Sequence, residues 1–164
     1  GYLLMIAGFH NESGEKRKVA ANAGLMFGCV YAVLILLVYF AQATAVRNDS
    51  LNEQAAMLLD FSKGSLLFSY DLLGYGMMAL STFFTGLTIC PENRRDKWLK
   101  SLMMIHGVFF FGCLIMPMTG MFRAAMSDGS DSIGGTVALE FWCAYFLPIG
   151  VLSAIHFRSE DARK

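Results

Sequence analysis

Four long apolar runs dominate this chain, and short polar segments separate them. The runs cover residues 19–46, 66–90, 98–122 and 133–157. An α-helix rises about 1.5 Å per residue, so roughly 20 apolar residues cross the hydrocarbon core of a bilayer. Each run is long enough. The sequence therefore predicts an all-α polytopic integral membrane protein, built as an antiparallel bundle of four full transmembrane helices.

A soluble four-helix protein is the alternative, and the composition argues against it. Apolar residues make up 55% of the chain and charged residues only 16%. Too little amphipathic sequence remains to cover four buried helices with polar faces. The chain also has no room for a soluble catalytic domain. We therefore treat residues 1–164 as a single transmembrane domain.

Lysine and arginine are distributed unevenly among the polar segments, and this predicts an orientation. They are frequent in residues 10–18, between the second and third runs, and at the C-terminus, but sparse in residues 47–64 and 123–132. Cytoplasmic loops carry the excess of basic residues, so the C-terminus is predicted to be cytoplasmic. Short loops favour a bacterial inner membrane. Because topology explains the basic loops, they do not indicate nucleic-acid binding.

Two shorter segments lie outside the four runs. Residues 2–9 are apolar but too few to span a bilayer, so they are either a truncated fifth crossing or an interfacial segment. Residues 50–61 have the spacing of an amphipathic helix. Ser50 and Glu53 match the capping-box pattern at its start. We expect this helix to lie on the outer membrane surface or to cap the bundle.

Small and polar residues predict which helix faces contact protein. Gly24 and Gly28, together with Ala20, form a stripe that lets two helices approach closely, either within the chain or in a homodimer. Two further stripes should also face protein rather than lipid. They comprise Asp71, Gly74, Met78, Ser81, Thr85 and Thr88 in the second run, and Thr136, Glu140, Cys143, Ala144, Val151 and Ala154 in the fourth. Pro117 and Pro148 predict kinks.

Two carboxylates fall at membrane depth and are the strongest functional candidates. Asp71 and Glu140 lie at similar depths in the predicted outer half of the bundle. An intramembrane charge is costly unless it is paired, hydrogen-bonded or protonated, and such residues commonly mark ion or ligand sites. With Gln42, Arg123 and Tyr75 nearby, they predict a ligand-binding site for a cation, a proton or a small polar ligand.

The alternative is a structural or regulatory membrane subunit. In that case Asp71 or Glu140 forms a fixed ion pair with Arg123, and the function lies in contacts with a partner protein. The expected partners are the lipid bilayer and either a second copy of the chain or another membrane protein. The sequence contains no nucleophile–base pair, which argues against an enzyme.

Two histidines lie toward the predicted cytoplasmic side. His106 is a candidate proton relay to the carboxylates. His106 and His156 on two helices could also ligate a haem, but they lie at different depths, and a pair of axial ligands should face one iron. The four cysteines have no C-x-x-C spacing, so no metal or redox motif is indicated. We expect no cofactor.

Overall fold

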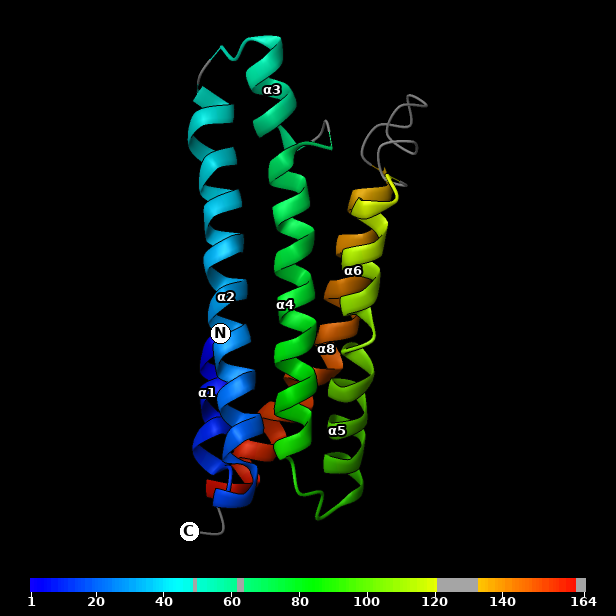
Figure 1. The fold of residues 1–164 in the computed structure, drawn as a ribbon. Helices are drawn as coiled ribbons and strands as arrows, with labels where there is room; N and C mark the ends of the chain where they lie inside the picture. The colour runs from blue at the N-terminus through cyan, green and yellow to red at the C-terminus, as the bar shows by residue number, and fades with distance from the viewer. Residues whose placement is uncertain (49, 62–63, 121–132, 162–164) are drawn as a thin grey trace.

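The computed structural model of the chain is an all-α bundle of long helices (Figure 1). It describes residues 1–48, 50–61, 64–120 and 133–161, apart from the side chains of residues 133–139 and 160–161. The elements are α1 (Tyr2–Glu12), a 3₁₀ turn (Glu15–Arg17), α2 (Lys18–Ala41) with a π-helical continuation (Gln42–Val46), α3 (Glu53–Leu59), α4 (Leu66–Thr88), α5 (Arg94–His106), α6 (Phe109–Met118) and α8 (Ile133–Asp161).

Helices α2 and α4 form an antiparallel pair that lies side by side along most of its length (Figure 1). Glycine makes the approach close: a Cβ atom on Gly24 would lie 2.6 Å from Oγ1 of Thr85, and one on Gly28 would lie 3.0 Å from Oγ of Ser81. The Ser81 hydroxyl donates a 2.6 Å hydrogen bond to the Gly24 carbonyl. The glycine stripe therefore packs within the chain. A homodimer through Gly24 and Gly28 would have to displace α4.

Helix α4 is the central element of the bundle. All six residues of its predicted stripe, from Asp71 to Thr88, are buried, so the prediction that this face contacts protein is confirmed. The stripe is covered because α4 packs against α2 as well as α5 and α6. Polar residues can occupy this helix at low cost where their hydroxyl groups bond to backbone carbonyls, as Thr85 does to Ser81 at 2.8 Å.

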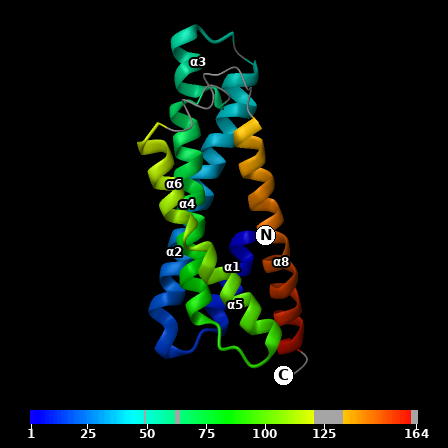
Figure 2. The same cartoon turned by 90° about the vertical axis from the view of Figure 1, so that its right-hand side faces the viewer.

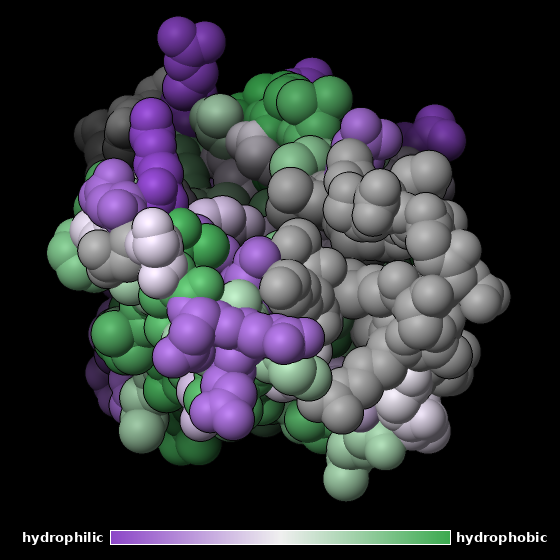
Figure 3. All heavy atoms as spheres, turned by 90° about the horizontal axis from the view of Figure 1, so that it is seen from above, coloured by the Kyte–Doolittle hydropathy of each residue, from purple (hydrophilic) through white to green (hydrophobic). Residues whose placement is uncertain are grey.

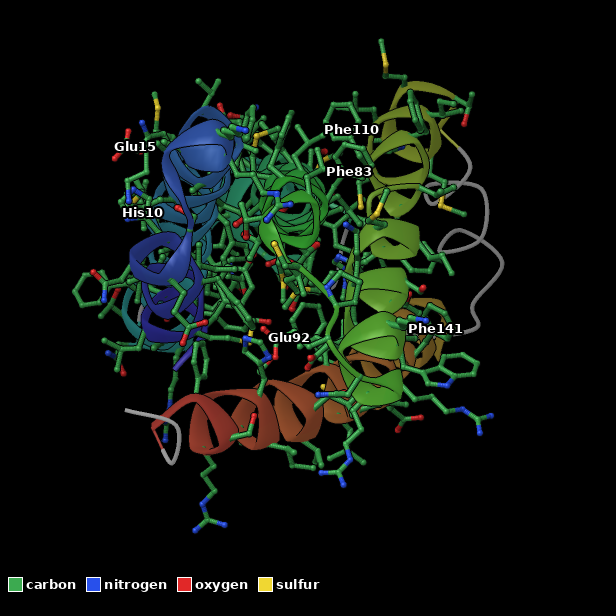
Figure 4. All side chains as sticks on the ribbon, turned by 90° about the horizontal axis from the view of Figure 1, so that it is seen from below. His10, Glu15, Phe83, Glu92, Phe110 and Phe141 are labelled. Atoms are coloured by element: carbon green, nitrogen blue, oxygen red, sulfur yellow. The ribbon has the colours of Figure 1, made fainter. Side chains whose placement is uncertain are left out.

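The predicted single helix over residues 98–122 is interrupted. The amides of Gly107 and Val108 bond to carbonyls three residues earlier, at 3.1 and 3.0 Å, and α6 begins only at Phe109. A Cβ atom on Gly107 would lie 2.8 Å from Cβ of Phe83, so glycine permits the contact with α4 at this point. Phe83 and Phe110 occupy the space between α4 and the α5–α6 segment (Figure 4). We had expected the kink at Pro117, which instead lies in the last turn of α6.

Helix α8 is inclined to the other helices (Figures 1 and 2). It packs against α5, and its C-terminal part also meets α1. The prediction for its buried face is wrong, because Glu140, Cys143, Ala144, Val151 and Ala154 are all exposed. The face toward the bundle carries bulky side chains instead. It comprises Trp142, Tyr145, Phe146, Ile149 and Ser153, which follow helical spacing. These large side chains fill the space beside α5 that small residues could not fill.

Helix α1 packs against α2 and α4 with one of its faces. It starts about midway along the molecule and runs toward the end that holds the C-terminus (Figure 1). Ile6 and Phe9 are almost fully buried, and Gly8 meets the ring of Phe157 on α8. The opposite face of α1 is exposed, with Leu4 at 78%. Whether residues 2–9 belong to a crossing or to an interfacial segment stays a prediction.

Helix α3 sits at the opposite end, above α2 and α4 (Figure 1). Its N-cap is Asn52, whose Oδ1 accepts a 2.8 Å hydrogen bond from the Ala55 amide. The predicted Ser50–Glu53 capping box is therefore wrong. Asparagine is an equally good cap, and it stands one residue before the first helical position. Seen from this end, hydrophilic side chains form separate patches among hydrophobic ones (Figure 3).

Three helical segments are long and apolar enough to cross a membrane. They cover Glu15–Val46, Arg94–Met118 and Glu140–Ser159, in agreement with three of the four predicted crossings. Helix α4 is not among them, although its 23 residues have the required length. It carries Asp71 and several hydroxyl residues in place of apolar ones. The crossing of α4 stays a prediction.

Candidate functional site

Ionisable side chains gather in two regions along the bundle. The first, which we call the acidic tyrosine cluster, lies in the half that ends at α3 and comprises Asp71 and Tyr75 on α4 with Tyr31 and Tyr39 on α2. The second lies in the half that ends at the C-terminus and contains His106 on α5 and His156 on α8. The two regions differ in how their polar atoms are satisfied.

Asp71 is the buried acid of the first region. Its side chain is 4% exposed, and its Oδ1 has no hydrogen-bond partner among the residues that the structure describes. A buried carboxylate oxygen without a partner costs free energy, and much more when the group is ionised. An unpaired buried acceptor in a native fold calls for an explanation, such as an ion or a proton bound there.

Three tyrosines surround this carboxylate. Asp71 is close enough to Tyr31, Tyr39 and Tyr75 to act on each of them electrostatically. The hydroxyl groups of Tyr39 and Tyr75 are close enough to influence each other, and the rings of Tyr31 and Tyr75 lie 6.1 Å apart. The cluster therefore joins α2 to α4 through hydroxyl groups, which are oxygen donors and acceptors of the kind that a proton or a hard cation needs.

Sequence reasoning found Tyr75 but missed Tyr31. The missing signal was a spacing: Tyr31 and Tyr39 stand eight residues apart, which places both on one broad face of α2. Tyr70 directly precedes Asp71, so it points to a different face of α4.

The other predicted ligand-binding residues do not join the cluster. Gln42 binds the segment after α3, donating to the Leu59 carbonyl at 2.6 Å and accepting from the Phe61 amide at 3.2 Å. Glu140 is exposed on α8, and no hydrogen bond or ion pair joins it to Asp71. Similar depth along the membrane did not bring the two acids together. Arg123 lies outside the described residues.

His106 is fully buried in the second region, with both ring nitrogens engaged. Trp142 on α8 donates from Nε1 to His106 Nε2 at 3.0 Å, and His106 Nδ1 lies 2.6 Å from Oγ1 of Thr82 on α4. Since Nε2 accepts, the neutral ring carries its proton on Nδ1 and donates to Thr82. The Thr82 hydroxyl in turn donates a hydrogen bond to the Ala79 carbonyl at 2.9 Å. The ring thus joins three helices.

This geometry bears on the predicted relay role. A second ring proton on His106 would have to displace the indole N–H of Trp142, because Nε2 cannot accept and donate at once. The rings of Tyr145 and Phe146 also pack on His106, with centroids 5.4 and 5.0 Å away. These contacts suit a fixed neutral ring better than a group that exchanges protons.

His156 joins three helices at the C-terminal end. Its Nδ1 lies 3.0 Å from Oδ1 of Asp96 on α5, and its Nε2 lies 3.2 Å from Oε2 of Glu12 on α1. An imidazole can donate to two carboxylates only when it is protonated. The sequence drew attention to His156 but not to Asp96 or Glu12, which stand within or beside basic segments and looked like ordinary loop charges.

Neither histidine has a ring nitrogen free for iron, so the two do not form an axial haem pair. Among the described residues, no group of three or more histidine, cysteine, aspartate or glutamate side chains is arranged to hold a metal ion. No known protein family, curated protein or solved structure matches the chain. The geometry of the two polar regions is therefore the basis on which function is argued.

Proposed function

We propose that this chain is a small multi-span membrane protein that binds one positive charge, a proton or a monovalent cation, at Asp71. The observation that carries the proposal is the unpartnered Oδ1 of this buried side chain. Ionised carboxylates in a hydrocarbon environment cost several kcal/mol, and a bound proton or cation removes most of that cost. Hydroxyl groups from Tyr39 and Tyr75 would complete the site.

The charge balance favours a single charge over a divalent ion. Asp71 has no acidic neighbour in contact, because Glu140 is exposed on another helix, and no ion pair within the described residues involves Asp71. Calcium takes six to eight oxygen ligands, commonly from several carboxylates. The low exposure of Asp71 also leaves little room for a larger polar ligand.

The membrane setting follows from the same residues. Helix α4, at about 1.5 Å per residue, is about 35 Å long and would span the hydrocarbon core beside α2. The polar face of α4 would then contact protein, while the helices around it contact lipid. With the basic segments on the cytoplasmic side, Asp71 falls in the outer half. The short loops are the ground on which we place the protein in a bacterial inner membrane.

Thermal stability across a pH series tests the proposal, using the wild type, Asp71→Asn and Glu140→Gln in detergent. We expect wild-type stability to fall as the pH rises, because ionised Asp71 would be buried with no partner for its Oδ1 among the described residues. Asp71→Asn should lack this fall, since the amide cannot ionise. Glu140→Gln is the matched control and should behave as the wild type does. Equal pH responses in all three proteins would refute the proposal.

A second arm identifies the occupant. At high pH, NaCl or KCl should restore wild-type stability if a monovalent cation binds, whereas choline chloride at equal ionic strength should not. If only low pH restores stability, the occupant is a proton. The stability of Asp71→Asn should be the same in NaCl, KCl and choline chloride at equal ionic strength. Transport of the bound charge is a further step, and a flux assay in vesicles would measure it.

A structural or regulatory subunit is the second candidate function. The networks of His106 and His156 favour it, because both are fully bonded within the chain. On this hypothesis Asp71 would be paired by a partner protein, and Asp71→Asn would weaken the complex without changing any response to pH or salt. Co-purification of the wild type and of Asp71→Asn from the native membrane separates the two candidates.

A further inference from the structure

Trp142 is the side chain of α8 that reaches both polar regions. Its ring lies 5.2 Å from that of Tyr75 in the acidic tyrosine cluster. Its indole nitrogen donates to His106 at 3.0 Å. The ring also packs on Phe109 at the start of α6, with centroids 5.4 Å apart. One residue thus touches α4, α5 and α6.

Tyr145 and Phe146 also anchor this part of α8: the Tyr145 hydroxyl donates to the Leu102 carbonyl at 2.8 Å, and both rings pack on His106. The remaining residues face outward. Glu140, Phe141, Cys143 and Ala144 are exposed around Trp142, and Leu147 and Pro148 are exposed one turn further on. Among these residues, Trp142 is the one whose ring packs on Tyr75 of the acidic tyrosine cluster. A movement of Tyr75 would displace the indole ring, since rings in contact cannot move independently in a packed interior.

We infer that Trp142 couples the acidic tyrosine cluster to α8, so that binding at Asp71 changes the surroundings of the indole ring and its hydrogen bond to His106. This rests on the proposed function of Asp71. The path is short: Asp71 acts on Tyr75, Tyr75 packs on Trp142, and Trp142 donates to His106. Trp142 is a positioning residue in this scheme, because it touches the tyrosine and not the carboxylate.

Several titratable groups face this path, and the experiment must separate them from Asp71. They are Tyr31 and Tyr39 on α2, Tyr75 on α4, His106 on α5, Cys113 on α6, and Glu140, Cys143 and Tyr145 on α8. A response that persists after Asp71→Asn belongs to one of these groups. A response that disappears belongs to Asp71.

Intrinsic fluorescence provides a direct readout. The chain has two tryptophans, and Trp98 is 56% exposed on α5, so Trp98→Phe leaves Trp142 as the single reporter. We expect its emission to change in a step when the Trp98→Phe protein is titrated with protons, or with NaCl at high pH. The step should be lost in the Trp98→Phe, Asp71→Asn double variant.

A binding measurement excludes a purely structural role. Trp142→Phe keeps a ring beside Tyr75 but cannot donate to His106. We expect the concentration of protons or Na⁺ at the midpoint of the Asp71-dependent stability response to shift by about fivefold or more, a typical coupling between linked sites. Leu147→Ala, at a position 70% exposed on the same helix, should leave the midpoint unchanged.

The outcomes distinguish this inference from the proposed function. If stability responds through Asp71 while the Trp142 emission stays constant and Trp142→Phe keeps the wild-type midpoint, the coupling is refuted and the binding site stands. If neither stability nor emission responds through Asp71, both proposals fall together. An Asp71-dependent step in emission, with a shifted midpoint in Trp142→Phe, supports both.

Discussion

The two polar regions of this bundle are buried to a similar extent but bonded in opposite ways. His106 is 0% exposed and Asp71 is 4% exposed. Both ring nitrogens of His106 have partners, whereas Oδ1 of Asp71 has none among the described residues. Burial alone therefore does not identify a functional group. The difference lies in whether the fold itself supplies the partners.

A fully bonded network strengthens a fold and leaves little capacity for a ligand. His106 on α5 ties α4 to α8, and His156 on α8 contacts both α1 and α5. An incomplete site costs stability until something binds to it, and that cost makes binding favourable. We therefore assign architecture to the histidine region and ligand binding to the acidic tyrosine cluster. The following predictions test this division.

The largest expected effect is on His106. His106→Leu removes the acceptor for Trp142 Nε1 and leaves that donor buried without a partner. We expect the free energy of unfolding to fall by about 2–4 kcal/mol, the cost of an unsatisfied buried donor plus poorer packing. Denaturant titration in detergent measures it. His106→Gln can still accept a hydrogen bond and should lose less. A His106→Leu protein as stable as the wild type would contradict the architectural role.

The contact between α2 and α4 should be the next most sensitive. In Gly24→Ala the new methyl group would lie 2.6 Å from Oγ1 of Thr85, so the two helices must separate. Overpacking of this kind typically costs about 1–3 kcal/mol. Gly112→Ala on α6 is the matched control, because nothing lies within 4 Å of its Cβ position. Thermal melts of the two variants should differ clearly. Equal melts would mean that α2 and α4 do not pack as described.

A smaller effect is expected at His156, which is more accessible than His106. His156→Gln cannot reach Asp96 and Glu12 together, because its amide donates in one general direction. Loss of one charge-assisted hydrogen bond should lower stability by about 1–2 kcal/mol. His10→Gln provides a comparison, since His10 has only an exposed contact with Asn22. If both substitutions lower stability equally, the link between α1, α5 and α8 does not contribute to stability as proposed.

The sequence predicted the lengthwise arrangement of the helices well. Hydropathy placed runs over 19–46 and 66–90, and the structure has helix from Lys18 to Val46 and from Leu66 to Thr88. It also identified the buried face of α4, because polar residues in an apolar helix must avoid lipid. The helix positions and the buried face of α4 depend on composition and spacing along one helix, and both can be read from the sequence.

The rotation and tilt of α8 could not be predicted in the same way. Glu140 was placed on the wrong face, because the facing direction of a residue depends on the packing of the neighbouring helices. Small residues suggested one contact face, yet Trp142, Phe146 and Ile149 fill the space against the bundle. The break at Gly107 was missed for a similar reason, since it depends on Phe83 in another helix.

Infrared difference spectroscopy tests the assignment of Asp71 most directly, because protonated and ionised carboxyl groups absorb at separate frequencies. The wild type is compared between low and high pH, and between NaCl and choline chloride, with Asp71→Asn and Glu140→Gln measured alongside. We predict a carboxyl band that changes with pH or Na⁺ in the wild type and in Glu140→Gln and is absent from Asp71→Asn. A band that persists in Asp71→Asn, or that disappears only in Glu140→Gln, would contradict the placement of the site at Asp71.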